Sequence, residues 1–210
     1  LAIRNRPKNV NSYNEIWFLP HKIFAYETFL YILAALIKIE AFQHVHTLLH
    51  TSYLLPDHIT SPGMEFANYS ELYLSSDYLQ SKLSPENYRL YSPVAELVKQ
   101  SATRDDVSFD DLKQADLVAL MISFINPSIF WYPQMLLYSG HYEKYPLFTR
   151  AIQHRGFKSI AVITGIDDSK LLAQKLTEGE AQRNTSNWYH FGFNRDFLNQ
   201  MNVSRLDSIE

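Results

Sequence analysis

The pattern of apolar positions predicts one long helix in the first quarter of the chain. From about His21 to Tyr53 the sequence holds neither glycine nor proline, and apolar residues cover most of the circumference of the helix it would form. Histidines and charged residues become frequent toward its end. A helix with apolar residues on several sides must be packed by other elements, so we expect a mainly α-helical domain built around it.

Capping residues mark the starts of further helices. Ser108, followed three residues later by Asp111, predicts a helix N-terminus. The apolar run over 117–125 that follows fits either a helix or a buried strand, because a run of this length does not distinguish them. Asp168 predicts the start of a helix over 170–182.

One short strand is expected late in the chain. The pattern predicts a helix over 147–155 that ends at Gly156. The run over 159–163 then combines apolar and β-branched residues, which favours a strand.

The whole sequence, 1–210, is interpreted as a single domain with irregular ends. Residues 1–20 are largely polar, 56–70 hold prolines and a glycine that predict a loop, and the tail over 183–210 mixes polar and aromatic residues without a clear period. The sequence begins with leucine rather than methionine, which suggests a fragment of a longer protein. The longest apolar run, Phe29–Ile37, is about half of what a membrane-spanning helix needs, so no membrane partner is expected.

Composition excludes several classes of protein. A hydrophobic content of 46% supports a real core, and a net charge of −3 from 19 basic and 22 acidic residues excludes a general nucleic-acid coat. With no cysteine, disulfides, thiolate zinc sites and cysteine nucleophiles are excluded, which fits a cytoplasmic setting. The six glycines form no phosphate-binding loop, so we expect no nucleotide cofactor.

Two histidines have the spacing of a metal-binding pair. His46 and His50 are four residues apart, so on a helix their imidazoles share a face. A metal site needs a third ligand, and the sequence does not supply one at a recognisable spacing. We therefore expect no metal and interpret the pair as part of a half-exposed helix end.

A cluster of basic residues is the best candidate for binding a phosphate or an acidic partner. The stretch 144–158 holds no acidic residue and includes Arg150, His154, Arg155 and Lys158. Arg150 and His154 would share a face if this stretch were one helix. The same charges also fit a face that is simply exposed to solvent. If the chain binds nucleic acid, we expect it to do so only through this patch.

The stretch 129–148 is the most aromatic part of the chain. Trp131, Tyr132, Tyr138 and Tyr142 belong to it, and tryptophan and tyrosine are enriched both in buried packing and at protein interfaces. Core packing is the more common outcome, and an interface is the functional interpretation.

Arg183 and His190 suggest a different activity. Arg183-Asn184 with His190 resembles the ribonuclease motif of HEPN domains, in which the imidazole does acid–base chemistry on a ribose hydroxyl while the guanidinium holds the phosphate. That motif belongs to a helical bundle, whereas the polar residues 184–187 weaken a helix.

Three segments together resemble a known kind of domain. They are Tyr26-Glu27-x-Phe29-Leu30-Tyr31-x-x-Ala34, then Phe109-x-x-Leu112-x-x-Ala115-Asp116, then Trp131-x-Pro133-x-x-Leu136-x-Tyr138 followed by Phe148-x-Arg150-Ala151. Their order over residues 20–165 resembles an uncharacterised helical domain toward the C-terminus of bacterial multidomain proteins, some of which carry a TIR-like or other effector domain ahead of it. The resemblance implies a bacterial cytoplasmic setting and a role in sensing or assembly, and none of its motifs is catalytic.

The sequence therefore leads to two functional hypotheses. The first is a non-catalytic module that senses a ligand, binds a protein partner or a missing N-terminal domain of the same chain, or associates with itself. The alternative is a metal-independent, HEPN-like ribonuclease that uses Arg183 and His190.

Overall fold

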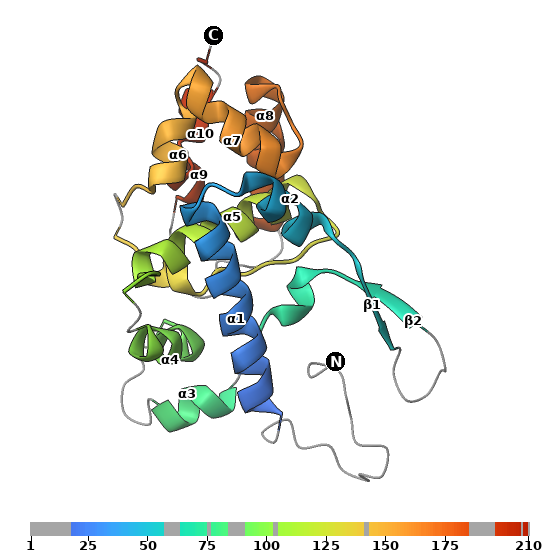
Figure 1. The fold of residues 1–210 in the computed structure, drawn as a ribbon, viewed down its shortest axis with the longest axis vertical. Coiled ribbons are helices and arrows are strands. Elements are labelled where there is room, and N and C mark those ends of the chain that lie inside the picture. Colours follow the sequence, from blue (N-terminus) through green and yellow to red (C-terminus); the bar gives the residue numbers. More distant parts are fainter. Residues whose placement is uncertain are drawn as a thin grey trace.

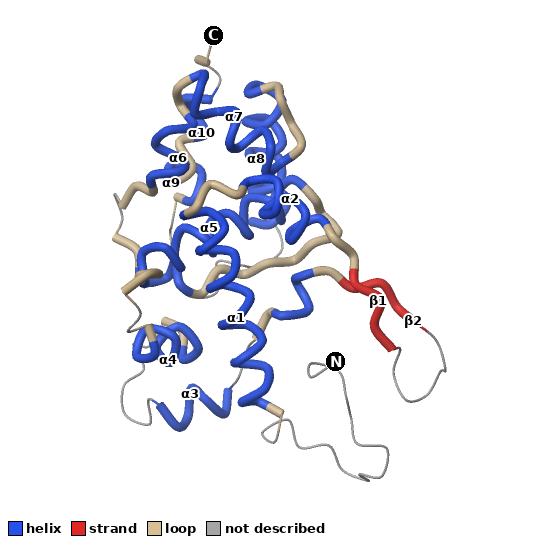
Figure 2. The backbone as a smooth tube through the Cα atoms, in the orientation of Figure 1, coloured by secondary structure: helices blue, strands red, loops and turns tan. Residues whose placement is uncertain are grey.

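The computed structural model of the chain is mainly α-helical, as the sequence predicts (Figures 1 and 2). It describes residues 18–56, 64–74, 77–83, 91–102, 105–140, 143–184, 196–206 and 208–209. The elements follow in the order α1 (Leu19–Lys38), α2 (Phe42–His50), β1 (Tyr53–Pro56), β2 (Met64–Ala67), the 3₁₀-helix η2 (Tyr69–Leu72), α3 (Asp77–Leu83), α4 (Pro93–Ser101), α5 (Phe109–Ile125), the 3₁₀-helix η3 (Met135–Tyr138), α6 (Pro146–Ala151), α7 (His154–Thr164), α8 (Ser169–Asn184), α9 (Phe197–Gln200) and α10 (Val203–Leu206).

The core is organised around α5. Every residue from Leu112 to Phe124 is buried, and the helix packs against α1, α8 and η3. Its start matches the prediction, because Ser108 Oγ accepts a hydrogen bond from the Asp111 backbone N–H at 3.2 Å while the Asp111 carboxylate accepts one from the Ser108 N–H at 2.8 Å. The run over 117–125 is therefore part of a helix, not a strand.

The predicted long helix over 21–53 is wrong, because the chain breaks after Lys38 and starts again as α2. Glu40 adopts the left-handed conformation with φ of 59°. The Ala41 N–H then bonds the Leu36 carbonyl and the Glu40 N–H bonds the Ile37 carbonyl, which is the Schellman pattern that ends many helices. Glycine usually holds this position. Here the residue is a glutamate, so the sequence has no glycine that would mark the break.

The predicted strand over 159–163 is also wrong, because these residues belong to α7. Phe157, Ile160 and Ile163 lie three residues apart and form the buried face of that helix, so the helical period overrides the β-branched composition. Gly156 does not end a helix. It lies inside α7, where an added Cβ atom would come within 2.0 Å of the Arg150 carbonyl oxygen, so a glycine allows α7 to pack against the end of α6.

The hairpin and the C-terminal helices also differ from the sequence interpretation. Residues 64–67, expected to be loop, form β2, which pairs antiparallel with β1 so that Tyr53 faces Ala67. Figure 2 shows this hairpin projecting from the helical body.

The tail beyond Arg183, expected to be irregular, includes α9 and α10, and α10 packs against α8. Asp168 caps α8 as predicted, accepting hydrogen bonds from the Lys170 and Leu171 N–H groups.

Candidate functional site

Trp131, the tryptophan of the aromatic stretch over 129–148, belongs to the core and not to the surface. Trp131 is fully buried, and its ring stacks on Tyr26 with ring centroids 5.6 Å apart. Phe29 and Tyr69 pack against it at tilted angles. Trp131 therefore cannot contact a partner in this fold, and its assignment as an interface residue is wrong.

Asp116 explains why this tryptophan is held inside. Its carboxylate accepts hydrogen bonds from Trp131 Nε1 at 2.7 Å, from the Met135 N–H at 2.7 Å and from the Leu136 N–H at 3.2 Å. Burial raises the pKa of Asp116 from its ordinary value of 3.8 to about 7, although these hydrogen bonds act in the opposite direction. The residue thus connects α5 to the loop that carries Trp131 and to the start of η3.

The tyrosines of the predicted interface are half-buried. The Tyr138 hydroxyl donates a hydrogen bond to the Ser92 carbonyl at 3.2 Å, and the Tyr138 ring meets Tyr91 and Phe109 edge to face. Tyr132 meets the ring of Tyr73 in the same way. Tyr142 lies outside the described residues. Tyr132 and Tyr138 therefore pack largely against the molecule itself.

Arg183 bridges three parts of the fold. Its Nη2 group donates hydrogen bonds to the backbone carbonyls of Ser123, at 2.8 Å, and Ile129, and its guanidinium lies 5.2 Å from the centre of the Phe130 ring. The helical partner of the Ser123 carbonyl would be the N–H of residue 127, which is a proline and has none. Arg183 supplies the missing donor. His190 lies outside the described residues, so the ribonuclease pair stays a prediction.

The basic residues divide between two helices. Arg150 lies on α6 and forms an ion pair with Glu40 at 2.5 Å, whereas His154, Arg155 and Lys158 are exposed on the first half of α7. Arg150 and His154 therefore do not share a helix face, contrary to the expectation of one continuous helix. All four residues are exposed, and Arg150 differs from the three on α7 in being held by its ion pair with Glu40.

The histidine pair contacts a helix end. His46 and His50 stack with ring centroids 4.2 Å apart, and His46 Nδ1 and His50 Nε2 both donate hydrogen bonds to the Ile163 carbonyl near the end of α7. Partial burial, followed by the neighbouring His46, lowers the pKa of His50. Among the described residues, no group of three or more histidine and acidic side chains is placed to hold a metal ion.

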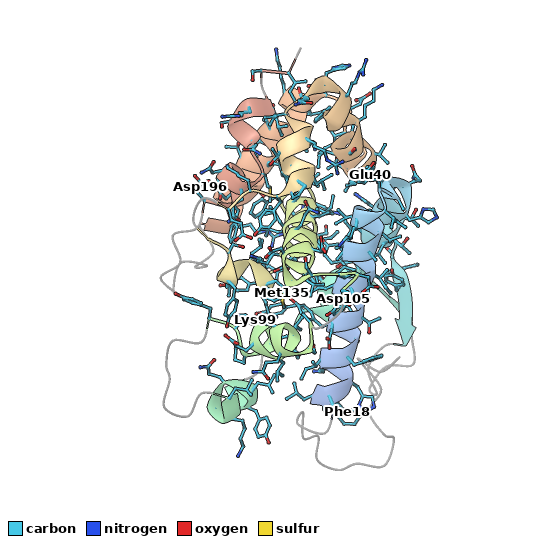
Figure 3. All side chains as sticks on the ribbon, turned by 60° about the vertical axis from the view of Figure 1, so that its left-hand side comes forward. Phe18, Glu40, Lys99, Asp105, Met135 and Asp196 are labelled. Atoms are coloured by element: carbon cyan, nitrogen blue, oxygen red, sulfur yellow. The ribbon has the colours of Figure 1, made fainter. Side chains whose placement is uncertain are left out.

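A surface that sequence reasoning did not single out lies on α1. Phe24, Ile32 and Ile39 are 70%, 47% and 72% exposed. Figure 3 shows α1 along one flank of the molecule, between Phe18 before its start and Glu40 after its end. We call Phe24, Ile32 and Ile39, together with the half-buried Thr28, Tyr31 and Ala35 that lie among them, the α1 stripe. The signal in the sequence was that apolar residues surround this helix on more sides than a core contact requires.

A groove accompanies the α1 stripe. Its volume is about 400 Å³, and it is lined by Phe24, Glu27, Thr28, Tyr31, Ile32 and Ser101. Ser101, the last residue of α4, donates a hydrogen bond to Glu27 Oε1 at 2.6 Å and so connects the two walls. The groove combines apolar walls with one carboxylate, which suits an apolar side chain better than a charged ligand.

A second hollow lies between α8 and the α9–α10 pair. It measures about 680 Å³, and its lining is mostly polar: Lys170, Ala173, Gln174, Thr177, Glu178, Asp196, Leu198, Asn199, Val203 and Ser204. Several of these groups bond one another, because Gln174 donates to Glu178 and Asp196 caps α9. Its polar groups are thus partly satisfied within the hollow.

The chain matches no protein-family model, and comparisons with curated proteins and with solved structures also found no match. Within the part of the chain that the structure describes, no helix combines the length and the apolarity that a membrane span requires.

Proposed function

We propose that the chain is a non-catalytic module of a larger protein, which binds a protein partner or associates with itself and thereby controls another domain. The observation that supports this proposal is the α1 stripe. Apolar residues that are exposed singly are normal on protein surfaces, but an aligned set beside a groove is typical of an interaction site. The α1 stripe therefore takes the role that the sequence assigned to Trp131.

The exposed basic residues of α7 provide a second contact in this proposal. Arg155 and Lys158 are exposed one helical turn apart, which suits an acidic side chain or a phosphate on the partner. The Glu40–Arg150 ion pair joins the end of α1 to α6, the helix before α7. A partner that covers the end of the α1 stripe would thus lie near these charges. The resemblance to helical domains of bacterial multidomain proteins supports a cytoplasmic setting for this role.

The test compares binding by two matched variants. Phe24→Glu places a charge in the α1 stripe, whereas Leu171→Glu does the same at an exposed apolar residue of α8. We expect Phe24→Glu to weaken self-association, or binding to the separately produced domains of the parent protein, at least about tenfold in sedimentation and pull-down measurements. Leu171→Glu should behave as the unchanged chain. Equal behaviour of all three proteins, or no association of any kind, would contradict the proposal.

A further inference from the structure

The histidine pair of α2 lies at a place that the proposed function does not use. His46 Nδ1 and His50 Nε2 both point at the Ile163 carbonyl oxygen, at distances of 3.0 and 3.2 Å. The geometry points to a binding site for one divalent transition-metal ion such as Zn²⁺, held by the two imidazoles and this carbonyl. The site shares no residue with the α1 stripe, so its test is independent of the proposed function.

The carbonyl is the third ligand that the sequence did not reveal. Ile163 lies 117 positions after His46, and a backbone oxygen gives no signal in the residue type. The packing of α2 against α7 brings this oxygen to the pair (Figure 1). Two imidazoles and one carbonyl leave further positions on the ion for water. The site is therefore of the open kind, which exchanges its ligands, and not a closed structural site.

The distances between the three ligand atoms fit a shared ion. Zinc binds nitrogen and oxygen ligands at about 2.0–2.2 Å, so two ligands about 90–100° apart at the ion lie about 3.0–3.2 Å from each other. Both nitrogen–oxygen distances at Ile163 have such values. The imidazole rings stack with their centroids 4.2 Å apart, and their nitrogens face the same oxygen. One ion can therefore reach a nitrogen of each ring.

Charge at this end of α7 suits a cation. Ile163 lies in the last turn of α7, where the carbonyls lack helical N–H partners and the helix dipole is negative. Partial burial, followed by the neighbouring His46, lowers the pKa of His50, so at pH 7 its imidazole is neutral and can bind a metal. Imidazole suits Zn²⁺, Ni²⁺ and Cu²⁺, whereas Mg²⁺ prefers oxygen ligands.

The ion would join two helices that are distant in the sequence. The unfolded chain does not hold the Ile163 carbonyl beside the histidines, so the ion binds the folded chain better and stabilises it. Two imidazoles bind zinc more weakly than the three or four side chains of an ordinary zinc site. We therefore expect a dissociation constant of about 1–100 µM.

Isosteric substitutions separate metal binding from hydrogen bonding. The amide nitrogen of asparagine takes the place of histidine Nδ1, and that of glutamine takes the place of Nε2, so both can still donate to the Ile163 carbonyl. We expect His46→Asn and His50→Gln to lower the affinity for Zn²⁺ at least about tenfold in calorimetric titration. His44→Asn is the matched control, because His44 is exposed on the same helix but points away from the pair.

Thermal unfolding gives a second measurement. Free Zn²⁺ at about a hundredfold excess over the dissociation constant should raise the melting temperature of the unchanged chain and of His44→Asn by about 5 °C. The two isosteric variants should respond much less, and Mg²⁺ should have no effect on any of the proteins.

Several outcomes would overturn the metal site. They are no binding of Zn²⁺ up to about 1 mM, undiminished binding by His46→Asn or His50→Gln, an equal loss in His44→Asn, or an equal response to Mg²⁺. The proposed function stays open under each of them, because its test depends on Phe24→Glu and not on the histidines.

Discussion

The carboxyl group of Asp116 makes folding stability depend on pH. Its pKa is about 7 in the folded chain and 3.8 in its ordinary state, so between about pH 4 and 7 the folded state binds more protons than the unfolded state. The proton on Asp116 therefore contributes its full stabilisation of the folded chain below about pH 4. As the pH rises from there to about 7, the free energy of unfolding falls by at most about 1.4 kcal/mol per pH unit.

Replacing this group isolates its effect. We expect Asp116→Asn to remove this part of the pH dependence, because asparagine does not titrate. It should also lower stability at all pH values, since an amide offers one acceptor oxygen to the donors that the carboxylate now satisfies. Urea unfolding at pH 5 and pH 8 measures both effects. A pH dependence that is the same in both proteins would contradict the role of Asp116.

Glu40 carries a backbone conformation that glycine adopts at no cost. We expect Glu40→Gly to stabilise the chain by about 0.5–1 kcal/mol, because the left-handed position no longer holds a Cβ atom. The lost ion pair with Arg150 is exposed and contributes less than this. Glu40→Ala is the control, since it removes the ion pair but keeps the Cβ atom and should not stabilise. Thermal unfolding distinguishes the two.

We expect Arg183 to stabilise the folded chain. Arg183→Ala leaves the Ser123 and Ile129 carbonyls without their side-chain donor and should lower the free energy of unfolding by about 2 kcal/mol. The ribonuclease hypothesis predicts instead that His190→Ala removes RNA cleavage by roughly 100-fold or more with little change in stability. Unfolding and RNA cleavage measured on both variants separate the two roles. Cleavage that His190→Ala leaves unchanged would contradict the ribonuclease hypothesis.

At the scale of elements, α5 and α8 cross closely at Gly179. An added Cβ atom there would lie 2.1 Å from the Phe124 carbonyl oxygen, a backbone atom that cannot move aside cheaply. We expect Gly179→Ala to destabilise the chain by about 1–3 kcal/mol, although alanine has the higher helix propensity. Gly140→Ala is the control, because its nearest neighbours lie at 3.8 Å and beyond. Equal melting temperatures for the two variants would contradict the close crossing.

Elements were predictable from the sequence where a local signal defines them. Ser108 and Asp111 form their capping box through side chains three residues apart, so the start of α5 needs no distant contact. The break at Glu40 was not predictable, because the residue gives no sign that it takes a left-handed conformation. The strand prediction over 159–163 failed because these residues pack against α2 and α6, which favours a helix. Local composition does not record such distant contacts.

At the scale of the whole molecule, the candidate site follows from what is left uncovered. The sequence showed apolar residues all around α1, but which side stays exposed depends on where α5, α2 and η2 pack. For the aromatic stretch the sequence predicted an exposed interface where the fold has a buried tryptophan. Trp131 donates a hydrogen bond to the buried Asp116, 15 positions away in the sequence, and a contact at that distance leaves no local signal. Residue types indicated the chemistry of an interface, while the fold determined its location.

The complete burial of Leu112–Phe124 in α5 also determines how the molecule opens. No side of Leu112–Phe124 faces water, so its backbone amides reach solvent only when the helices around it separate together. Their hydrogen exchange therefore reports the stability of the entire fold, whereas the projecting two-stranded hairpin can open by itself. Each amide of this buried stretch is thus a local probe of global unfolding, and any ligand that slows its exchange must bind the folded chain.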